Sequence, residues 1–150
     1  MTPAAEVLTA MSIPHREFTH PGPVESLEQA AAERGQHPDQ VIRSILFHIT
    51  EGEYMLVLTG GPQQIDWRKL RRYLGISRLR MANPEEVLDV TGFQIGSVGP
   101  FGLSRPIRTL VNRRLFEQEE VSIGSGVRGT TIFIKTKDLK RALGNFEEIE

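Results

Sequence analysis

The sequence lacks cysteine altogether, and its apolar stretches are short. Without cysteine the chain has no disulfide, no thiolate nucleophile and no cysteine-ligated zinc site. No apolar run approaches the roughly 20 residues that span a bilayer. Residues 1–11 carry Glu6 and no basic side chain, which is unlike a signal peptide. We therefore expect a cytoplasmic protein with no membrane partner.

Histidine is also sparse, and its four copies are scattered. They show no metal-binding spacing, and the sequence has neither a Gly-x-Ser-x-Gly nucleophile motif nor a close carboxylate pair. We therefore expect no metal ion and no organic cofactor. Each histidine is more typical of a structural or surface role than of a ligand. His20 is of most interest, because it ends a predicted strand beside the Pro21-Gly22-Pro23 turn.

The composition is that of an ordinary folded domain. Hydrophobic residues make up 39% of the 150 positions and charged residues 25%. This length supports one hydrophobic core but is short for two. The sequence contains no internal repeat, low-complexity tract or linker, so we expect a single domain over residues 1–150.

A basic middle segment is concealed by the net charge of −1. Residues 66–114 include ten basic and four acidic side chains, which give this segment a net charge of +6. The rest of the chain has a net charge of −7. Such a segment in a neutral protein indicates a local anionic partner, although a solvated helix face would have the same composition. Four of the basic residues fall on one predicted helix: Arg68, Lys69, Arg71 and Arg72.

Capping residues and apolar periodicity predict helices and strands in mixed order. We expect helices at 3–11, 26–34, 66–74, 83–91 and 137–143. We expect strands at 14–19, 41–50, 54–59, 78–81, 106–111, 121–124 and 131–135, with a frayed tail at 147–150. Because helices and strands do not alternate strictly, the pattern favours an α+β fold with a mixed, largely antiparallel sheet over a doubly wound one.

The glycine-rich stretch 92–103 is the most unusual part of the sequence. Four glycines in the eleven residues 92–102 are costly unless the backbone must approach something closely or adopt positive φ. The stretch matches neither a P-loop nor a dinucleotide-binding fingerprint. A ligand-binding loop and a long surface turn are both compatible with its composition.

Two further segments could carry chemistry. Arg43 interrupts an apolar strand, on the face opposite Ile42 and Ser44. A buried guanidinium there needs a partner, so Arg43 either reaches the edge of the sheet or faces an occupied cleft. The stretch 124–131 joins two predicted strands and offers hydroxyls, backbone donors and one guanidinium.

Several segments, in order, resemble the YbaK/prolyl-tRNA-synthetase-associated domain family of aminoacyl-tRNA deacylases. The run Gly96-Ser97-Val98-Gly99-Pro100, followed by Phe101-Gly102, is similar to the family's Gly-x-x-x-Pro loop and is the most specific match. The remaining matches are at 18–21, 30–35, 39–46, 66–75, 82–93, 125–129 and 138–139. Arg43 stands where the family has a characteristic strand lysine.

The resemblance implies a fold, an activity and a set of site residues. It implies a YbaK-like, partly barrel-like sheet with surrounding helices, and hydrolysis of the ester of a mischarged tRNA (trans-editing), with mischarged aminoacyl-tRNA and an aminoacyl-tRNA synthetase as partners. The residues it implies for catalysis are Arg43, Gly96, Ser97, Val98, Gly99 and Pro100. Those it implies for substrate binding are His20, Ser44, Phe101, Ser125, Gly126, Thr130 and Thr131, and those for tRNA binding are Arg68, Lys69, Arg71 and Arg72.

Two functions therefore stand as hypotheses. The first is a free-standing aminoacyl-tRNA deacylase in which backbone donors of the Gly96–Pro100 loop stabilise the developing oxyanion. The second is a non-catalytic protein on the same fold that recognises an aminoacyl-tRNA, a nucleotide or a synthetase. The intact loop favours the first. Arg43 favours the second, because an arginine is larger than lysine and is never a neutral base.

Overall fold

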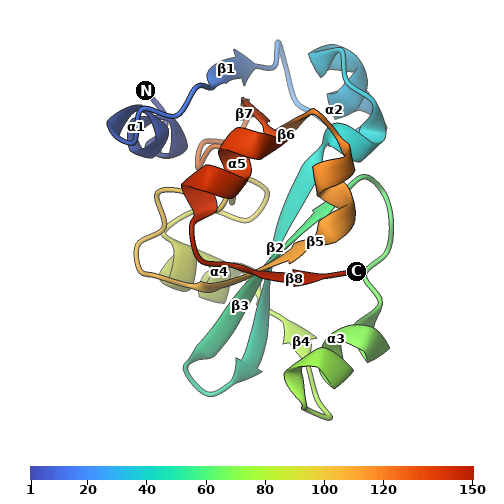
Figure 1. Cartoon of the computed structure of the whole chain (residues 1–150). Helices are drawn as coiled ribbons and strands as arrows, with labels where there is room; N and C mark the ends of the chain where they lie inside the picture. Colours follow the sequence, from blue (N-terminus) through green and yellow to red (C-terminus); the bar gives the residue numbers. More distant parts are fainter.

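Five α-helices surround two β-sheets in the computed structural model, which describes residues 1–150 (Figure 1). The helices are α1 (Pro3–Ala10), α2 (Leu27–Arg34), α3 (Trp67–Leu74), α4 (Pro84–Thr91) and α5 (Thr136–Leu143). Two short 3-10 helices, η1 (Pro38–Gln40) and η2 (Arg113–Glu117), were not expected from the sequence. No helix combines the length and the apolar character needed to cross a lipid bilayer.

The strands form one sheet of three strands and one of five, in the orders β1-β7-β6 and β4-β2-β3-β5-β8. Neighbours are antiparallel except for the pairs β3–β5 and β5–β8. This confirms the α+β class and the largely antiparallel sheet. Neither sheet closes, so the expected barrel character is not found. The strands are β1 (Arg16–Thr19), β2 (Ile42–Thr50), β3 (Glu53–Gly60), β4 (Arg80–Met81), β5 (Arg108–Asn112), β6 (Glu120–Gly124), β7 (Thr130–Lys135) and β8 (Glu147–Ile149).

The helices begin where polar side chains satisfy free backbone N–H groups. Thr2, Asp66 and Asn83 each accept a hydrogen bond from the N–H three residues later. Ser26 does the same for α2. The Gln29 side chain accepts from the N–H of Glu25 and so fastens the loop in front of the helix.

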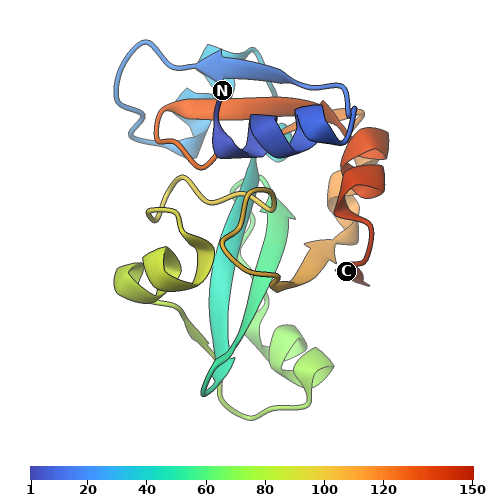
Figure 2. The same cartoon turned by 90° about the vertical axis from the view of Figure 1, so that its left-hand side faces the viewer.

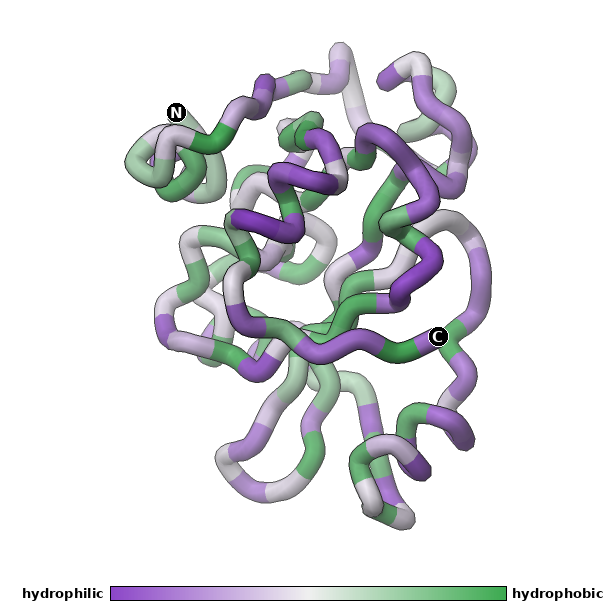
Figure 3. The backbone as a smooth tube through the Cα atoms, viewed as in Figure 1, coloured by the Kyte–Doolittle hydropathy of each residue, from purple (hydrophilic) through white to green (hydrophobic).

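Two apolar clusters hold the sheets and helices together. The larger lies between the sheets and includes Leu46, Leu58, Val111 and Ile132. The smaller is covered by α3, where Leu70 packs on Phe47 and the Trp67 ring meets Phe47 edge-on at 5.1 Å. Figure 3 shows hydrophobic residues gathered along the central strands, and Figure 2 shows α3 at the end of the five-stranded sheet far from α2.

The C-terminal residues form a strand, which corrects the expectation of a frayed tail. β8 pairs in parallel with β5. Polar contacts fix it: Arg108 donates two hydrogen bonds to Glu147, at 2.6 and 2.7 Å, and the Tyr73 hydroxyl donates a third. The run Glu147-Glu148-Ile149-Glu150 has no strand pattern of its own, because partners distant in sequence hold it.

The Glu147 contacts predict an acid-sensitive contribution to stability. Hydrogen bonds from Arg108 lower the pKa of Glu147 from its ordinary value of 4.5 to about 2, with a smaller effect from Tyr73. A lowered folded-state pKa stabilises the fold above the unfolded value, and this contribution disappears as the pH falls through about 4.5 to about 2. Urea denaturation between pH 7 and pH 2 should show a weaker pH dependence in Glu147→Gln than in the unaltered protein. Glu148→Gln is the control, and an equal change in both variants would contradict the assignment.

Candidate functional site

A cavity of about 990 Å³ lies between the two sheets. Its walls come from segments distant in sequence: the end of β1 and the following loop, α2, the first half of β2, the end of β4, the glycine-rich loop, and the β6–β7 connection. The lining residues fall within 19–34, 41–46, 81–87, 95–98 and 123–131. The cavity therefore brings together three of the segments singled out in the sequence, namely the strand around Arg43, the glycine-rich loop and the stretch 124–131.

The cavity opens where β2 and β6 stop pairing. The two strands share a single parallel bridge, Val41 to Ser122, and the residues that follow on each strand line the cavity. Beyond the bridge the glycine-rich loop also lies against the end of β6. A Cβ atom on Gly99 would lie 2.0 Å from the Gly124 carbonyl oxygen, and one on Gly124 would lie 2.1 Å from the Val98 carbonyl oxygen. Only glycine fits at these two positions, because backbone meets backbone there.

Further contacts dock the loop on the β6–β7 connection. The Gly126 N–H donates to the Ser97 carbonyl at 2.8 Å, and the Arg128 guanidinium donates to the Ile95 carbonyl at 3.0 Å. The Ser97 hydroxyl and N–H both donate to the Gln94 carbonyl, which closes a tight turn. Gly96 sits in that turn with φ +90°, a conformation that other residues rarely adopt.

This docking leaves backbone donors without partners beside the cavity. Gly96, Ser97 and Val98 line the wall. The Ser97 N–H is satisfied within the turn, whereas the N–H groups of Gly96 and Val98 have no hydrogen-bond partner in the chain. Unpaired backbone N–H groups at the wall of a partly enclosed cavity are suited to hold a carbonyl or an oxyanion.

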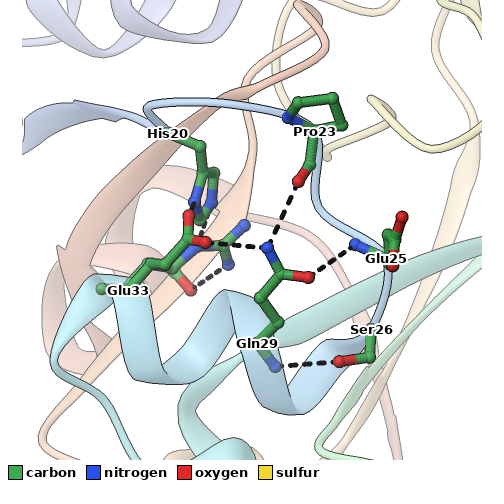
Figure 4. A network of polar contacts seen from close by, with 8 residues as sticks. His20, Pro23, Glu25, Ser26, Gln29 and Glu33 are labelled. Atoms are coloured by element: carbon green, nitrogen blue, oxygen red, sulfur yellow. Dashed lines mark hydrogen bonds and ion pairs between the residues drawn. The ribbon is translucent and has the colours of Figure 1, made fainter.

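A polar network lies at the wall of the cavity and supports α2 (Figure 4). The His20 side chain is 2% exposed, and its Nδ1 lies 2.6 Å from Glu33. Arg34 donates from Nε to His20 Nε2 at 3.0 Å, so the ring proton is on Nδ1 and is donated to Glu33. Gln29 donates to Glu33 at 2.8 Å and to the Pro23 carbonyl at 3.2 Å. Both nitrogens of His20 are thus occupied, and the network fixes the loop at 21–26 above the cavity.

Electrostatics within the network follow from these contacts. Hydrogen bonds from Gln29 and His20 lower the pKa of Glu33. Burial lowers the pKa of the Arg34 guanidinium, and the nearby Glu33 charge opposes that shift. Arg34 also donates to the buried Ser122 hydroxyl at 2.9 Å, but no carboxylate lies within 4 Å of it. The cavity wall therefore includes a cation with hydrogen-bond partners and no ion-pair partner.

Arg43 is held by the backbone rather than by an acidic residue. Its Nε donates to the Gly61 carbonyl at 3.0 Å, and a terminal nitrogen donates to the Gln63 carbonyl. Burial lowers the pKa of this guanidinium. Arg43 lines the cavity, yet its side chain is largely used to fasten the loop that leads from β3 to α3. The sequence left two alternatives for Arg43, an edge of the sheet or an occupied cleft. In the structure Arg43 lines the cavity, but its guanidinium is bonded to the loop at 61–63.

The other sequence-derived site residues divide into two groups. His20, Ser44, Thr130 and Thr131 line the cavity, together with Gly96, Ser97 and Val98. Gly99, Pro100, Phe101, Ser125 and Gly126 do not. Phe101 packs in the main core, and the Ser125 hydroxyl donates to the carbonyls of Val127 and Thr130. The second group therefore supports the shape of the cavity from behind.

The basic side chains of α3 lie away from the cavity. Arg68, Lys69 and Arg72 are exposed, Arg71 is half-buried, and none of them has an acidic partner within 4 Å. Figures 1 and 2 both show α3 at the opposite end of the molecule from α2. The helix is anchored by its apolar face and by the Tyr73 contact to β8, so its basic face is presented to solvent.

Sequence reasoning missed Arg34, Ile95 and Val127 as cavity residues. Arg34 is the last residue of α2, directly before Gly35. A basic residue is ordinary at a helix C-terminus, so nothing in the sequence indicates that Arg34 lines a cavity. The chain has no group of three or more His, Asp or Glu residues placed to hold a metal ion.

Comparisons with known proteins give the cavity a context. The family model for the aminoacyl-tRNA editing domain matches residues 21–142. A proline–tRNA ligase of Thermosipho melanesiensis is 36% identical over 89 residues, which are 59% of this chain and 16% of the ligase. The chain thus spans about a sixth of that relative. The uncharacterised protein YwhH of Bacillus subtilis is 32% identical over 114 residues, or 76% of this chain and 72% of YwhH.

A solved structure agrees over the full length. The crystal structure described as a candidate trans-editing enzyme for prolyl tRNA synthetase superposes with a TM-score of 0.85 at 26% identity, covering 100% of this chain and 97% of that one. The family model covers the β2 strand, the glycine-rich loop and the β6–β7 connection, which together form the cavity. The chain belongs to the aminoacyl-tRNA editing domain family.

Proposed function

We propose that this protein is a free-standing aminoacyl-tRNA deacylase that hydrolyses the ester of a mischarged tRNA in the cavity between its two sheets. The observation that carries the proposal is the pair of unpartnered N–H groups of Gly96 and Val98 at the cavity wall. An ester attacked by water develops an oxyanion, and donors fixed in advance lower the barrier because they need no reorganisation.

The residues divide into three roles in this proposal. The N–H groups of Gly96 and Val98 donate hydrogen bonds to the oxyanion, and water is the nucleophile. Gly99 and Gly124 keep those donors in place, since their backbones are in contact. Arg43, which is never a neutral base, positions the loop at 61–63 rather than moving a proton. The cavity side chains set which amino acid is accepted, at a discrimination of about 1–3 kcal/mol per methylene group.

Gly99→Ala tests where the ester binds. The added Cβ would overlap the Gly124 carbonyl, so the loop must move and the oxyanion donors with it. We expect hydrolysis of a panel of mischarged tRNAs to fall by about 100-fold, the usual effect of losing an oxyanion donor. Gly52→Asn, at the β2–β3 hairpin, is the control because a Cβ there meets nothing within 4 Å. Unchanged turnover in a folded Gly99→Ala protein would contradict this placement.

The basic face of α3 would bind tRNA phosphates beyond the acceptor end. Arg68 and Arg72 are exposed, lie one turn apart and have no acidic partner. Replacing both with Ala should weaken tRNA binding and reduce the slope of log K against log salt by about one to two. The control is Lys137 and Lys140 on α5, which are also exposed and are three residues apart. An unaltered slope in the α3 variant would make that helix an ordinary solvated face.

A second function is favoured by the contacts of Arg43. Because its guanidinium is bonded to two backbone carbonyls, this second function is a site that binds aminoacyl-tRNA, or a synthetase carrying it, without hydrolysing the ester. Arg43→Lys distinguishes the two functions in the same deacylation assay. We expect the unaltered protein to hydrolyse at least one mischarged tRNA, and Arg43→Lys to be slower because a single amine cannot hold both carbonyls. Hydrolysis by the variant alone would favour the binding protein.

A further inference from the structure

A second, smaller cavity lies on the other face of the five-stranded sheet. Its volume is about 310 Å³, which is at the lower end of the range for small-molecule sites. Val57 of β3 lines it and packs in the smaller apolar cluster, whereas the next residue, Leu58, packs in the larger cluster between the sheets. The two cavities share no lining residue. A ligand of this cavity would therefore be separate from the ester site.

The floor of the smaller cavity is apolar and comes from three elements. Val57 belongs to β3, Leu70 to α3 and Ile149 to β8. Val57 and Leu70 are buried, and Ile149 is half-buried. An aliphatic group that lies on this floor is removed from water, which favours its binding.

One buried hydroxyl faces the same space. Thr59 follows Val57 by two residues on β3, so both side chains lie on one face of the sheet. Thr59 is 4% exposed and lines the cavity, and its hydroxyl takes part in none of the side-chain hydrogen bonds of the chain. The fully enclosed side-chain atoms without a partner belong to Gln36 and Ser44, so the Thr59 oxygen is open to the cavity. A polar group of a ligand would supply the partner that this hydroxyl lacks.

The rim carries charged side chains of both signs. Lys69 and Arg114 provide two cations, and Asp66 and Glu150 provide two carboxylates. All four are exposed, and none belongs to the seven ion pairs of the chain. One carboxylate oxygen of Asp66 caps α3 by accepting from the Lys69 N–H at 3.0 Å. The remaining charged atoms are available to a ligand.

This balance of charges selects the class of ligand. A simple anion such as phosphate, or a simple cation, would meet two side chains of its own sign. A small molecule with one charge of each sign can place each end beside an opposite charge. Asn112 adds a donor, because its Oδ1 accepts from the Arg114 N–H at 3.0 Å and its amide nitrogen remains free.

We propose that this cavity binds a free α-amino acid with an aliphatic side chain. Lys69 and Arg114 hold the α-carboxylate, to which the Thr59 hydroxyl donates, and Asp66 holds the α-ammonium group. The aliphatic side chain lies on the floor formed by Val57 and its neighbours. The site goes beyond the proposed function and does not depend on ester hydrolysis.

The probes are L-leucine, L-isoleucine and L-valine, with three analogues that each lack one feature of leucine. 4-Methylpentanoate lacks the ammonium group, 3-methylbutylamine lacks the carboxylate, and glycine lacks the aliphatic side chain. Calorimetric titration of the whole chain at pH 7 should show saturable binding of at least one of the three amino acids. Each analogue should bind at least tenfold more weakly than leucine, because an opposite-charge contact or the apolar contact is lost. Absence of binding by all three amino acids, or an analogue as tight as leucine, would overturn the inference.

Variants decide whether the amino acid occupies this cavity. Arg114→Gln removes one cation from the rim and should weaken leucine binding at least tenfold. Arg113→Gln is the matched control, because Arg113 is adjacent, equally exposed and outside both cavities. Thr59→Val keeps the shape of the side chain, removes the hydroxyl and should weaken binding about fivefold. Leucine binding that neither Arg114→Gln nor Thr59→Val weakens would contradict the assignment.

NMR spectroscopy locates the ligand independently of the variants. In a ¹⁵N-correlated spectrum, leucine should shift the amide signals of Thr59 and Lys69. Shifts confined to residues 96–98 would place the amino acid in the larger cavity and overturn the inference. Since no tRNA is present in these measurements, their result is independent of whether the protein is a deacylase.

Discussion

The cavity depends on one close contact between two backbones. Gly99 and Gly124 meet without side chains between them, so the glycine-rich loop lies directly against the end of β6. The two sheets share the single bridge from Val41 to Ser122, and the lined space opens beyond it. The contact is short-range and steric, which makes it sensitive to any added carbon atom.

Polar contacts then hold the remaining walls in place. The His20–Glu33–Arg34 network ties the end of β1 to α2 and β6, and Gln29 extends it to the loop above the cavity. Such a network is stabilising when all its members are paired, and most of its groups are. The exception is the charge of Arg34, which has no carboxylate beside it. The cavity wall therefore carries a guanidinium that is hydrogen-bonded but has no carboxylate within 4 Å.

Local signals predicted much of the fold and less of the site. Helix starts at Thr2, Ser26, Asp66 and Asn83 could be predicted because capping is decided by residues within one turn. The parallel strand at 147–149 could not, because Arg108 and Tyr73 hold it from distant positions. Likewise the family resemblance predicted that the glycine-rich loop belongs to the site. It could not predict that Val98 lines the cavity whereas Phe101 packs in the core. That distinction depends on which residues the loop turns inward.

The β2 strand separates two tasks by its alternation. The side chains of Ser44 and Arg43 lie on opposite faces of the strand, and that of Arg43 fastens the loop that leads to α3. Both residues line the cavity, but only Arg43 also fastens that loop. A substitution at Ser44 can therefore alter the cavity wall without disturbing the loop that leads to the basic helix, although both residues belong to the same nine-residue strand.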